Sequence, residues 1–250
     1  MGSALLTRWL DQSDFTFVVV SPSGRAMPEN VEVVRSVEAL QDQAGFDLVV
    51  IAVKPQMISD VLPAYTEVLA DRGCFLSMAA GFATSSIEKL VGSKPVVRIM
   101  PNLPVQIGKG VSALYANEYA DQTHQDLVKD LMATTGQLIV AESEDGIDRF
   151  TAIAGSGPGY VFEIARCWMK AGQALGFSED EARQMVLQTL AGSVELAMNS
   201  DAPLGELRDG VTSKNGTTAA GLAALNHNAS LDVLLQQTVD AAYARAIELR

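Results

Sequence analysis

The residues best suited to chemistry lie between Val211 and Thr218, in the stretch Val-Thr-Ser-Lys-Asn-Gly-Thr-Thr. Several hydroxyl groups and one glycine gather here, just before an alanine-rich run with helical character. The first turn of a helix leaves backbone N–H groups without partners and carries partial positive charge. A small carboxylate can bind at such a place. The alternative is an ordinary helix cap, in which Thr217 or Thr218 caps a helix that runs to Asn226.

The elements that must position these residues read as an α/β domain followed by helices. Short, nearly unbroken apolar runs predict strands buried on both faces of a parallel sheet, at residues 15–20, 47–53, 73–78 and 96–99. Helical segments at 34–44, 58–70 and 85–91 lie between them, an alternation that predicts βαβ units. Two further strands, at 111–115 and 137–141, flank a helix at 121–134 and complete the sheet.

The strand pattern stops near Glu142, and we therefore expect two domains. Residues 1–142 form a doubly wound α/β sheet of the Rossmann type, and residues 143–250 form an all-α domain. Pro158 interrupts the first long helical run because it removes an amide donor. The later helices are amphipathic and rich in alanine and glycine, which permits close packing. One subunit can hardly bury so much apolar helix, so we expect at least a homodimer.

Ligands of a doubly wound sheet bind beyond the carboxyl ends of the strands. The candidates there are Ser21, Ser23 and Arg25 after the first strand, Lys54 and Pro55 after the second, and Asn102 after the fourth. An NAD site usually has an acidic residue where Ser21 stands. Hydroxyls beside a guanidinium suit a 2′-phosphate instead, which predicts NADPH in preference to NADH. Each candidate has an alternative without a ligand. The first turn could be a simple turn with a solvated Arg25, Lys54 could be a solvated side chain, and Asn102 could be an ordinary turn residue.

Composition narrows the class of protein. Eighteen basic and thirty acidic residues give a net charge of −12, which argues against a nucleic-acid surface. No apolar run approaches the roughly 20 residues of a membrane helix, and no signal peptide is apparent, so we expect a cytoplasmic protein. Cys74 and Cys167 lie far apart in sequence and are predicted to be reduced, buried thiols rather than a disulfide or part of a metal site.

Together these motifs resemble the pyrroline-5-carboxylate reductase family over essentially the whole chain. The segments that carry the resemblance are Met1 to Leu5, Ala52 to Pro55, Arg98 to Pro104, Gly155 to Pro158, and Val211 to Thr218 with the Ala-Ala-Gly-Leu that follows. The last segment is the most specific. Lys214-Asn215 stands where the family often has Pro-Gly, a tolerable departure because asparagine also adopts left-handed backbone angles.

The resemblance implies a Rossmann domain, a helical dimerisation domain and hydride transfer from NAD(P)H to the cyclic imine 1-pyrroline-5-carboxylate. The product is L-proline, and the reaction is the last step of proline biosynthesis. The residues implied for the substrate carboxylate and ring nitrogen are Ser213, Gly216, Thr217 and Thr218, with Thr218 as the catalytic hydrogen-bonding group. The cofactor residues, taken from the resemblance together with the positions after the strands, are Gly2, Ser3, Ser21, Ser23, Arg25, Val53, Lys54, Pro55 and Asn102. Those implied near the nicotinamide are Ala154, Gly155, Ser156 and Gly157.

The amino end departs from the family pattern. The family begins with a buried strand and a Gly-x-Gly-x-x-Gly turn, of which Gly2 matches only the third glycine. Roughly ten to twelve residues are missing, including the central strand of the sheet. A sheet without that strand exposes apolar faces and unpaired ladder groups, so we expect this chain to be unstable. Either Met1 is an internal methionine of a longer protein, which we favour, or the chain has lost cofactor binding.

Two other functions remain open from the sequence. A β-hydroxyacid dehydrogenase-like reductase also joins a Rossmann domain to a helical one, and its general acid would be Lys170. That reading does not explain the residues from Val211 to Thr218. A non-catalytic dimerising scaffold is the alternative if the shortened amino end is real.

Overall fold

The computed structural model describes residues 1–12, 14–24, 26–43 and 45–250. The chain divides into two compact units, residues 1–158 together with 242–250, and residues 159–241. The first unit therefore includes helix α5 (Glu144–Phe150) and the last residues of α10 (Ser230–Glu248). The boundary near residue 142 was expected from where strands give way to helices, and it stays a prediction.

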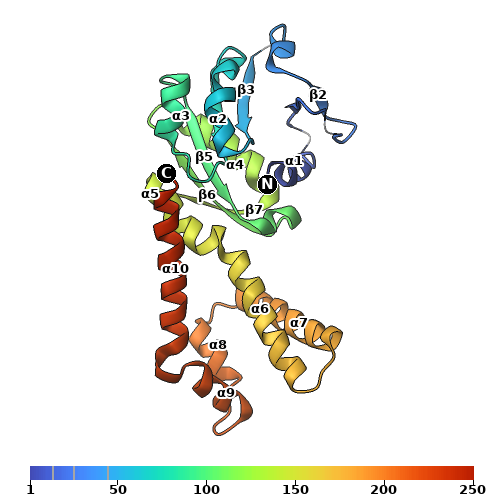
Figure 1. Cartoon of the computed structure of the whole chain (residues 1–250), viewed down its shortest axis with the longest axis vertical. Helices are drawn as coiled ribbons and strands as arrows, with labels where there is room; N and C mark the ends of the chain where they lie inside the picture. Colours follow the sequence, from blue (N-terminus) through green and yellow to red (C-terminus); the bar gives the residue numbers. More distant parts are fainter. Residues whose placement is uncertain (13, 25, 44) are drawn as a thin grey trace. The chain divides into compact units, whose positions relative to one another are not determined.

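Five strands of the first unit form one sheet, in the order of the sequence (Figure 1). They are β3 (Phe46–Ile51), β4 (Leu69–Ser77), β5 (Val96–Pro101), β6 (Gly110–Ala116) and β7 (Gly136–Val140). The first three run parallel to one another, as predicted, and β7 runs parallel to β6. The direction of β6 was not predicted, and it runs antiparallel to β5. Only the short 3₁₀ turn η3 (Leu103–Ile107) joins these two strands, and a parallel pairing needs a much longer crossover.

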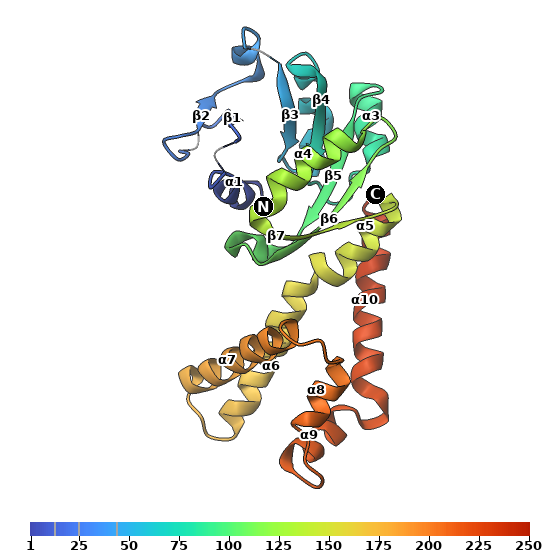
Figure 2. The same ribbon diagram turned by 180° about the vertical axis from the view of Figure 1, so that it is seen from behind.

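Helices cover both faces of this sheet, which makes the fold doubly wound. Leu76 of β4 packs with buried residues of α1 (Gly2–Trp9) and α4 (Gln122–Met132) on one face. The next side chain back along β4, Phe75, packs with residues of α2 (Pro55–Val61) and α3 (Thr84–Val91) on the other. This alternation is the period-two pattern of a strand buried on both sides. Figure 2 shows α4 crossing the sheet on its near face.

A separate two-stranded sheet precedes the main one. Strand β1 (Val18–Val20) pairs in parallel with β2 (Glu32–Val34), and within the described part of the chain neither strand pairs with β3. The helix predicted at 34–44 is wrong: β2 ends at Val34, and the described part of the range beyond it holds the 3₁₀ turn η1 (Val37–Leu40) with bends and turns on either side. Consecutive β-branched residues favour a strand where a neighbouring edge can accept it, and β1 provides that edge.

The helix predicted at 58–70 is also displaced. Helix α2 begins at Pro55, a position where proline costs no hydrogen bond, and passes into the 3₁₀ turn η2 (Leu62–Tyr65). Strand β4 already begins at Leu69.

After β7 the chain is helical. Helix α5 continues into a π-helical turn, η5 (Thr151–Gly155), before α6 (Gly157–Ala174), so the predicted interruption at Pro158 is found as a change of helix type. The remaining helices are α7 (Glu179–Met198), α8 (Leu204–Gly210), α9 (Thr217–Leu225) and α10. The capping box of Ser178 and Glu181 opens α7. No described helix is both long and apolar enough to cross a membrane.

Candidate functional site

The start of α9 presents unpartnered backbone donors. Gly216 is the N-cap residue, and the first helical hydrogen bond runs from Ala220 N–H to Gly216 O at 3.1 Å. The amides of Thr217, Thr218 and Ala219 are thus left without partners inside the helix. No side chain caps the helix, so the alternative in which a threonine caps it is wrong. This end of α9 has the chemistry of an anion site.

The turn before α9 depends on its residue types. Asn215 has φ of 62°, the left-handed conformation expected of it in place of glycine. Gly216 donates its N–H to Ser213 O at 3.0 Å, and a Cβ at Gly216 would overlap the Ser213 hydroxyl. A side chain at this position would force the Ser213 hydroxyl to move from its place across the turn. The side chains of Ser213, Thr217 and Thr218 are exposed, so a ligand can reach their hydroxyls in this chain.

The start of α1 offers a second set of donors, in the first unit. The first helical bonds run from the amides of Ala4 and Leu5 to Met1 O, which leaves the amides of Gly2 and Ser3 without helical partners. A Cβ at Gly2 would lie 2.9 Å from the Cβ of Ala52, in the loop after β3, so only glycine allows this close approach. The arrangement fits the pyrophosphate of a dinucleotide.

The loop after β3 carries the predicted residues Val53, Lys54 and Pro55. Val53 and Lys54 are exposed, and Pro55 occupies the first turn of α2, where its fixed φ stiffens the loop. The same close approach of Gly2 to Ala52 therefore brings this loop to the start of α1.

The turn after β1 holds Ser21 and Ser23, whose hydroxyls lie 3.5 Å apart. Arg25 lies outside the described residues. A different arginine reaches this turn: Arg35 donates from Nη1 to Pro22 O at 3.3 Å, and its guanidinium lies against Gly24. Sequence reasoning missed Arg35 because it follows β2, not β1. The signal that could have revealed it is the pairing of Val20 with Val34, which carries the next residues of both strands together.

Asn102 lies at the end of β5 and joins two distant segments. Its Nδ2 donates to Ala154 O at 3.2 Å, and its Oδ1 accepts from Val111 N–H at 3.0 Å. The structure thus brings together two residues that were predicted near the nicotinamide. The side chain is 8% exposed, and both ends of its amide are held, so its orientation is fixed. The Asn102 side chain therefore does more than stabilise the turn in which it lies.

The segment from Ala154 to Gly157 includes the end of the π turn. Ser156 N–H donates to Thr151 O at 2.8 Å, which closes this wide turn. No atom lies within 4 Å of a Cβ built on Gly157, so in this chain its lack of a side chain leaves open space. Single π turns occur often at functional sites because they displace the backbone from the regular helical path.

Comparison with known proteins decides the family. A family model described as pyrroline-5-carboxylate reductase dimerisation matches residues 144–249. Pyrroline-5-carboxylate reductase of Pseudomonas aeruginosa is 37% identical over 221 residues, which cover 88% of this chain and 80% of that protein. The chain belongs to the pyrroline-5-carboxylate reductase family. The resemblance seen in the sequence is confirmed.

Solved structures of this family share the fold. The reductase of Coxiella burnetii is 29% identical with a TM-score of 0.88, covering 99% of this chain and 94% of that one. The pyrroline carboxylate reductase of Plasmodium falciparum, solved with NADP bound, is 29% identical with a TM-score of 0.84, covering 100% and 94%. The prediction of a Rossmann-type sheet followed by helices is confirmed.

A buried ion pair supports the strand ends in this member of the family. Arg98 of β5, with a side chain 1% exposed, pairs with Glu144 at the start of α5. The other carboxylate oxygen of Glu144 accepts from Thr84 N–H at 2.6 Å, at the start of α3. Arg98 also donates to Ala79 O at 3.4 Å. One carboxylate thus ties together β5, α3 and α5, and sequence reasoning did not identify it.

The carboxyl end of the chain packs in the same unit. The Tyr243 hydroxyl donates to Asp145 at 2.5 Å, and this hydrogen bond, with the charges of Arg149 and Arg250, lowers the pKa of Asp145. Asp148 pairs with Arg250, yet desolvation by burial outweighs that charge and raises the pKa of Asp148.

The two cysteines differ in environment. Cys74 is fully buried, and desolvation, with the charges of Asp121 and Asp47, raises its pKa to about 12. The prediction that Cys167 is buried is wrong, because it is exposed on α6 in the single chain. The described residues contain no group of three or more histidine, cysteine or acidic side chains placed to hold a metal ion.

Proposed function

We propose that this chain reduces 1-pyrroline-5-carboxylate to L-proline with a nicotinamide cofactor, as the last step of proline biosynthesis. The observation that carries the proposal is the open start of α9, where three amides and three exposed hydroxyls surround a turn in which Gly216 leaves room for the Ser213 hydroxyl. The names of its relatives, identical at 31 to 37% over most of this chain, support the same reaction.

The substrate is a small cyclic imine with one carboxylate. We assign the carboxylate to the amides at the start of α9 and to the hydroxyls of Ser213 and Thr217, with Gly216 leaving room for it. We assign Thr218 to the ring nitrogen, where its hydroxyl holds the imine in one orientation. A protonated imine is already electrophilic, so the protein needs mainly to orient it and exclude water. This accounts for a set of residues with no strong general acid.

The cofactor, when bound, supplies the hydride that reduces the imine carbon. The residues that would hold its pyrophosphate are Gly2 and Ser3, and the loop from Val53 to Pro55 would lie beside it. Asn102 and the segment from Ala154 to Gly157 would lie near the nicotinamide, where Asn102 keeps the π turn attached to the end of β5.

We further propose that NADPH is preferred to NADH. Ser21, Ser23 and Arg25 were assigned to the 2′-phosphate from the sequence, and Arg35 joins them because its guanidinium lies at the same turn. Two hydroxyls with cationic groups suit a phosphate dianion, while no carboxylate stands at Ser21 to receive a ribose hydroxyl. The NADP-bound relative from Plasmodium falciparum supports this assignment.

We also propose that the helical part forms a homodimer or a higher homo-oligomer. Helices α8, α9 and α10 have no buried residue in the single chain. Large apolar side chains such as Phe162 and Met198 are 60% and 80% exposed. Apolar surface of this extent marks an interface, and the matching family model describes a dimerisation domain.

The experiment that tests the function is NADPH oxidation driven by pyrroline-5-carboxylate. We expect Thr218→Ala to lower kcat by roughly ten-fold or more, because the ring nitrogen loses its hydrogen bond. Thr218→Ser keeps the hydroxyl and should retain most of the activity, which separates a chemical role from a structural one. Unchanged turnover in Thr218→Ala would refute the role of Thr218. A chain that forms the helical dimer but neither binds NADPH nor turns over would support the scaffold alternative.

Cofactor preference is tested by the ratio of KM for NADH to KM for NADPH. We expect Arg35→Gln to lower this ratio by about ten-fold, because a charged hydrogen bond to phosphate contributes about 1.5 to 3 kcal/mol. KM for NADH should stay within about two-fold. Arg25→Ala measures the contribution of the arginine assigned from the sequence. An unchanged ratio in both variants would overturn the preference for NADPH.

A further inference from the structure

The last residues of α10 belong to the first unit, although the residues before them form the second. Residues 242–250, called the 242–250 segment below, comprise the last turns of α10 and the two residues beyond it. Figures 1 and 2 both show the carboxyl end of the chain beside α5. None of the residues assigned above to substrate or cofactor lies in this segment.

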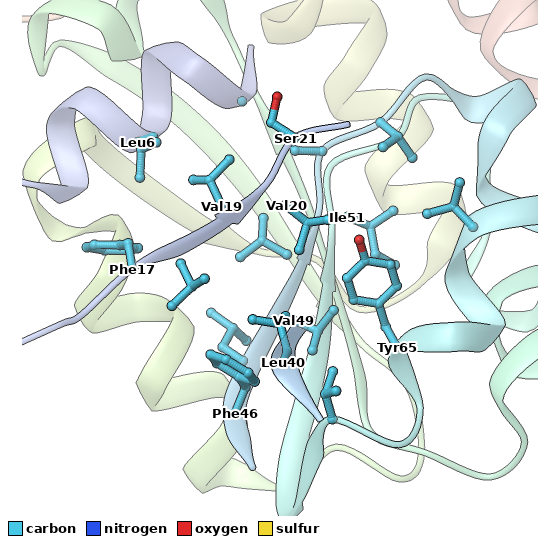
Figure 3. A pocket seen from close by; sticks show the side chains of 18 of the residues that line it. Leu6, Phe17, Val19, Val20, Ser21, Leu40, Phe46, Val49, Ile51 and Tyr65 are labelled. Carbon is cyan, nitrogen blue, oxygen red and sulfur yellow. The ribbon is translucent and has the colours of Figure 1, made fainter. Parts of the chain in front are cut away.

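The apolar pocket of the first unit does not involve this segment either. The pocket has a volume of about 530 Å³ and is lined by residues of β1, of β3 and of the start of α1. Figure 3 shows Val19 and Val20 on one side of it and Val49 and Ile51 on the other. Neither α5 nor the 242–250 segment contributes to the lining, so the contacts between those two elements are independent of the pocket.

Two side chains of the 242–250 segment bind neighbouring positions of α5. The Tyr243 hydroxyl donates to Asp145 at 2.5 Å, and the Arg250 guanidinium pairs with Asp148. Arg250 Nη2 also lies 3.9 Å from Asp145 Oδ1. Asp145 and Asp148 are three residues apart, so they lie on one face of the helix. The segment thus holds that face of α5 at two points.

A third contact reaches the loop after β4. Gly81 has φ of 69°, and a Cβ there would overlap the carbonyl group of Leu249. The obstacle is backbone rather than a movable side chain, so the lack of a side chain at Gly81 permits this approach. Arg98 donates to Ala79 O of the same loop at 3.4 Å. The segment is therefore fixed at the carboxyl end of a strand, the edge at which ligands of a doubly wound sheet bind.

Asp148 makes the pairing with Arg250 important. Its side chain is 3% exposed, and a buried carboxylate is costly unless a cation neutralises it. Arg98 also acts on Asp148 through its charge, but it pairs directly with Glu144. Among the described residues, Arg250 is the cation in direct contact with Asp148. Loss of Arg250 would leave that carboxylate without its contact partner.

Helix α5 passes what it gains from these contacts to the π turn η5. Thr151 N–H donates to Asp148 O at the end of α5, and Ser156 N–H donates to Thr151 O at 2.8 Å. The far side of the turn is held by Asn102, which donates to Ala154 O at 3.2 Å. A π turn departs from the regular helical path, so its position depends on what fixes it at each side. Asp148 fixes the side at which it begins.

We propose that the 242–250 segment positions the π turn for hydride transfer by holding α5 in place. Tyr243 and Arg250 are the positioning residues, and both act through α5. The link to hydride transfer rests on the proposed function, in which the end of this turn lies near the nicotinamide. Support of the turn itself does not rest on that function and is measured without cofactor or substrate. A displacement of about 1 Å slows a chemical step strongly, so a turn that loses support affects kcat more than binding.

The first test follows amide hydrogen exchange by NMR in the full chain. The N–H of Ser156 closes the π turn, so its exchange reports opening of that turn. We expect Arg250→Gln to speed exchange at Ser156 by about ten-fold, because α5 loses a charged contact. The Phe75 amide, which donates to Pro95 O at 2.9 Å, should exchange as it does in the unaltered chain. Unchanged exchange at Ser156, or equal acceleration at both amides, would overturn the proposal.

Matched variants separate this contact from a general effect of charge. Arg250→Lys keeps a positive charge for Asp148 and should restore slow exchange at Ser156. Arg245→Gln removes an arginine of the same segment that pairs with the exposed Glu248 at 2.8 Å, and it should leave Ser156 unchanged. In an Asp148→Asn background, Arg250→Gln should have less than about a two-fold further effect, because its partner is absent. Equal effects of Arg245→Gln and Arg250→Gln would contradict the assignment.

The second test is NADPH oxidation driven by pyrroline-5-carboxylate. We expect Arg250→Gln to lower kcat by about ten-fold. KM for NADPH should stay within about two-fold, because other residues hold the phosphates. Arg250→Lys should recover kcat, and Arg245→Gln should not change it. Faster exchange at Ser156 with unchanged kcat would overturn the role in hydride transfer. If the unaltered chain shows no turnover, the proposed function fails, and exchange at Ser156 still decides whether the segment supports the turn.

Discussion

Replacing Glu144 by glutamine tests how much the buried ion pair contributes to the first unit. The amide keeps the shape of the side chain and can still accept the Thr84 N–H, but it no longer neutralises Arg98. The Arg98 side chain is 1% exposed, and its Nε has no described hydrogen-bond partner, so its charge would be left in a poorly solvated place. Removing one partner of a buried pair costs about 3 to 5 kcal/mol. Because the Glu144 side chain is 18% exposed, we expect the lower end, about 3 kcal/mol.

The assay is urea unfolding followed by tryptophan fluorescence. The chain has two tryptophans, and a Trp168→Phe background leaves Trp9, which is buried in the first unit, as the only reporter. With a slope of about 2 kcal/mol per M, a loss of 3 kcal/mol lowers the urea midpoint by about 1.5 M. The matched control is Glu142→Gln, two residues away and exposed, which should change stability by less than about 0.5 kcal/mol.

A double variant shows whether Glu144→Gln loses stability because the charge of Arg98 is no longer neutralised or because packing is lost. Replacing both Arg98 and Glu144 by methionine removes both charges, and apolar replacement of a buried pair is often neutral or stabilising. We therefore expect the double variant to recover most of the stability lost in Glu144→Gln. A loss below about 1 kcal/mol in Glu144→Gln, or a double variant as unstable as the single one, would refute the reasoning.

Two further outcomes follow from the same unit. Cys74 should not react with a thiol reagent at pH 8 in a Cys167→Ser background until the protein is unfolded, because burial raises its pKa to about 12 and leaves about one thiolate in 10,000. Rapid reaction in the native state would contradict its burial. Tyr243→Phe should raise the pKa of Asp145, measured by carbon NMR of the carboxyl group, because the largest cause of its lowered pKa is the tyrosine hydroxyl. A depressed carboxyl pKa stabilises the fold above the unfolded value and loses that effect as pH falls through the folded value, so the variant should unfold at a higher pH on acidification. An unchanged Asp145 titration would count against this hydrogen bond.

Local patterns in the sequence were sufficient for much of the fold. Short apolar runs marked strands of the main sheet such as β3 and β5, because strands buried on both faces of a parallel sheet are nearly continuous in hydrophobicity. The turn before α9 was also readable, since the left-handed Asn215 and the crowded Gly216 depend on backbone conformation within a few residues. At residues 34–44 the sequence pattern predicted a helix, whereas the described part of that range holds the end of β2 and the 3₁₀ turn η1.

Other features were decided only by the tertiary structure, because they join residues whose separation along the chain carries no periodic signal. Arg35 reaches the turn of Ser21 only through the pairing of β1 with β2. Asn102 holds a carbonyl 52 positions away, and Arg98 meets Glu144 across 46 positions. The pocket beside β1 and β3 likewise exists only because two sheets stand next to each other. The sequence by itself determined which residues could bind a carboxylate or a nucleotide, whereas strand pairing decided which neighbours hold them in place.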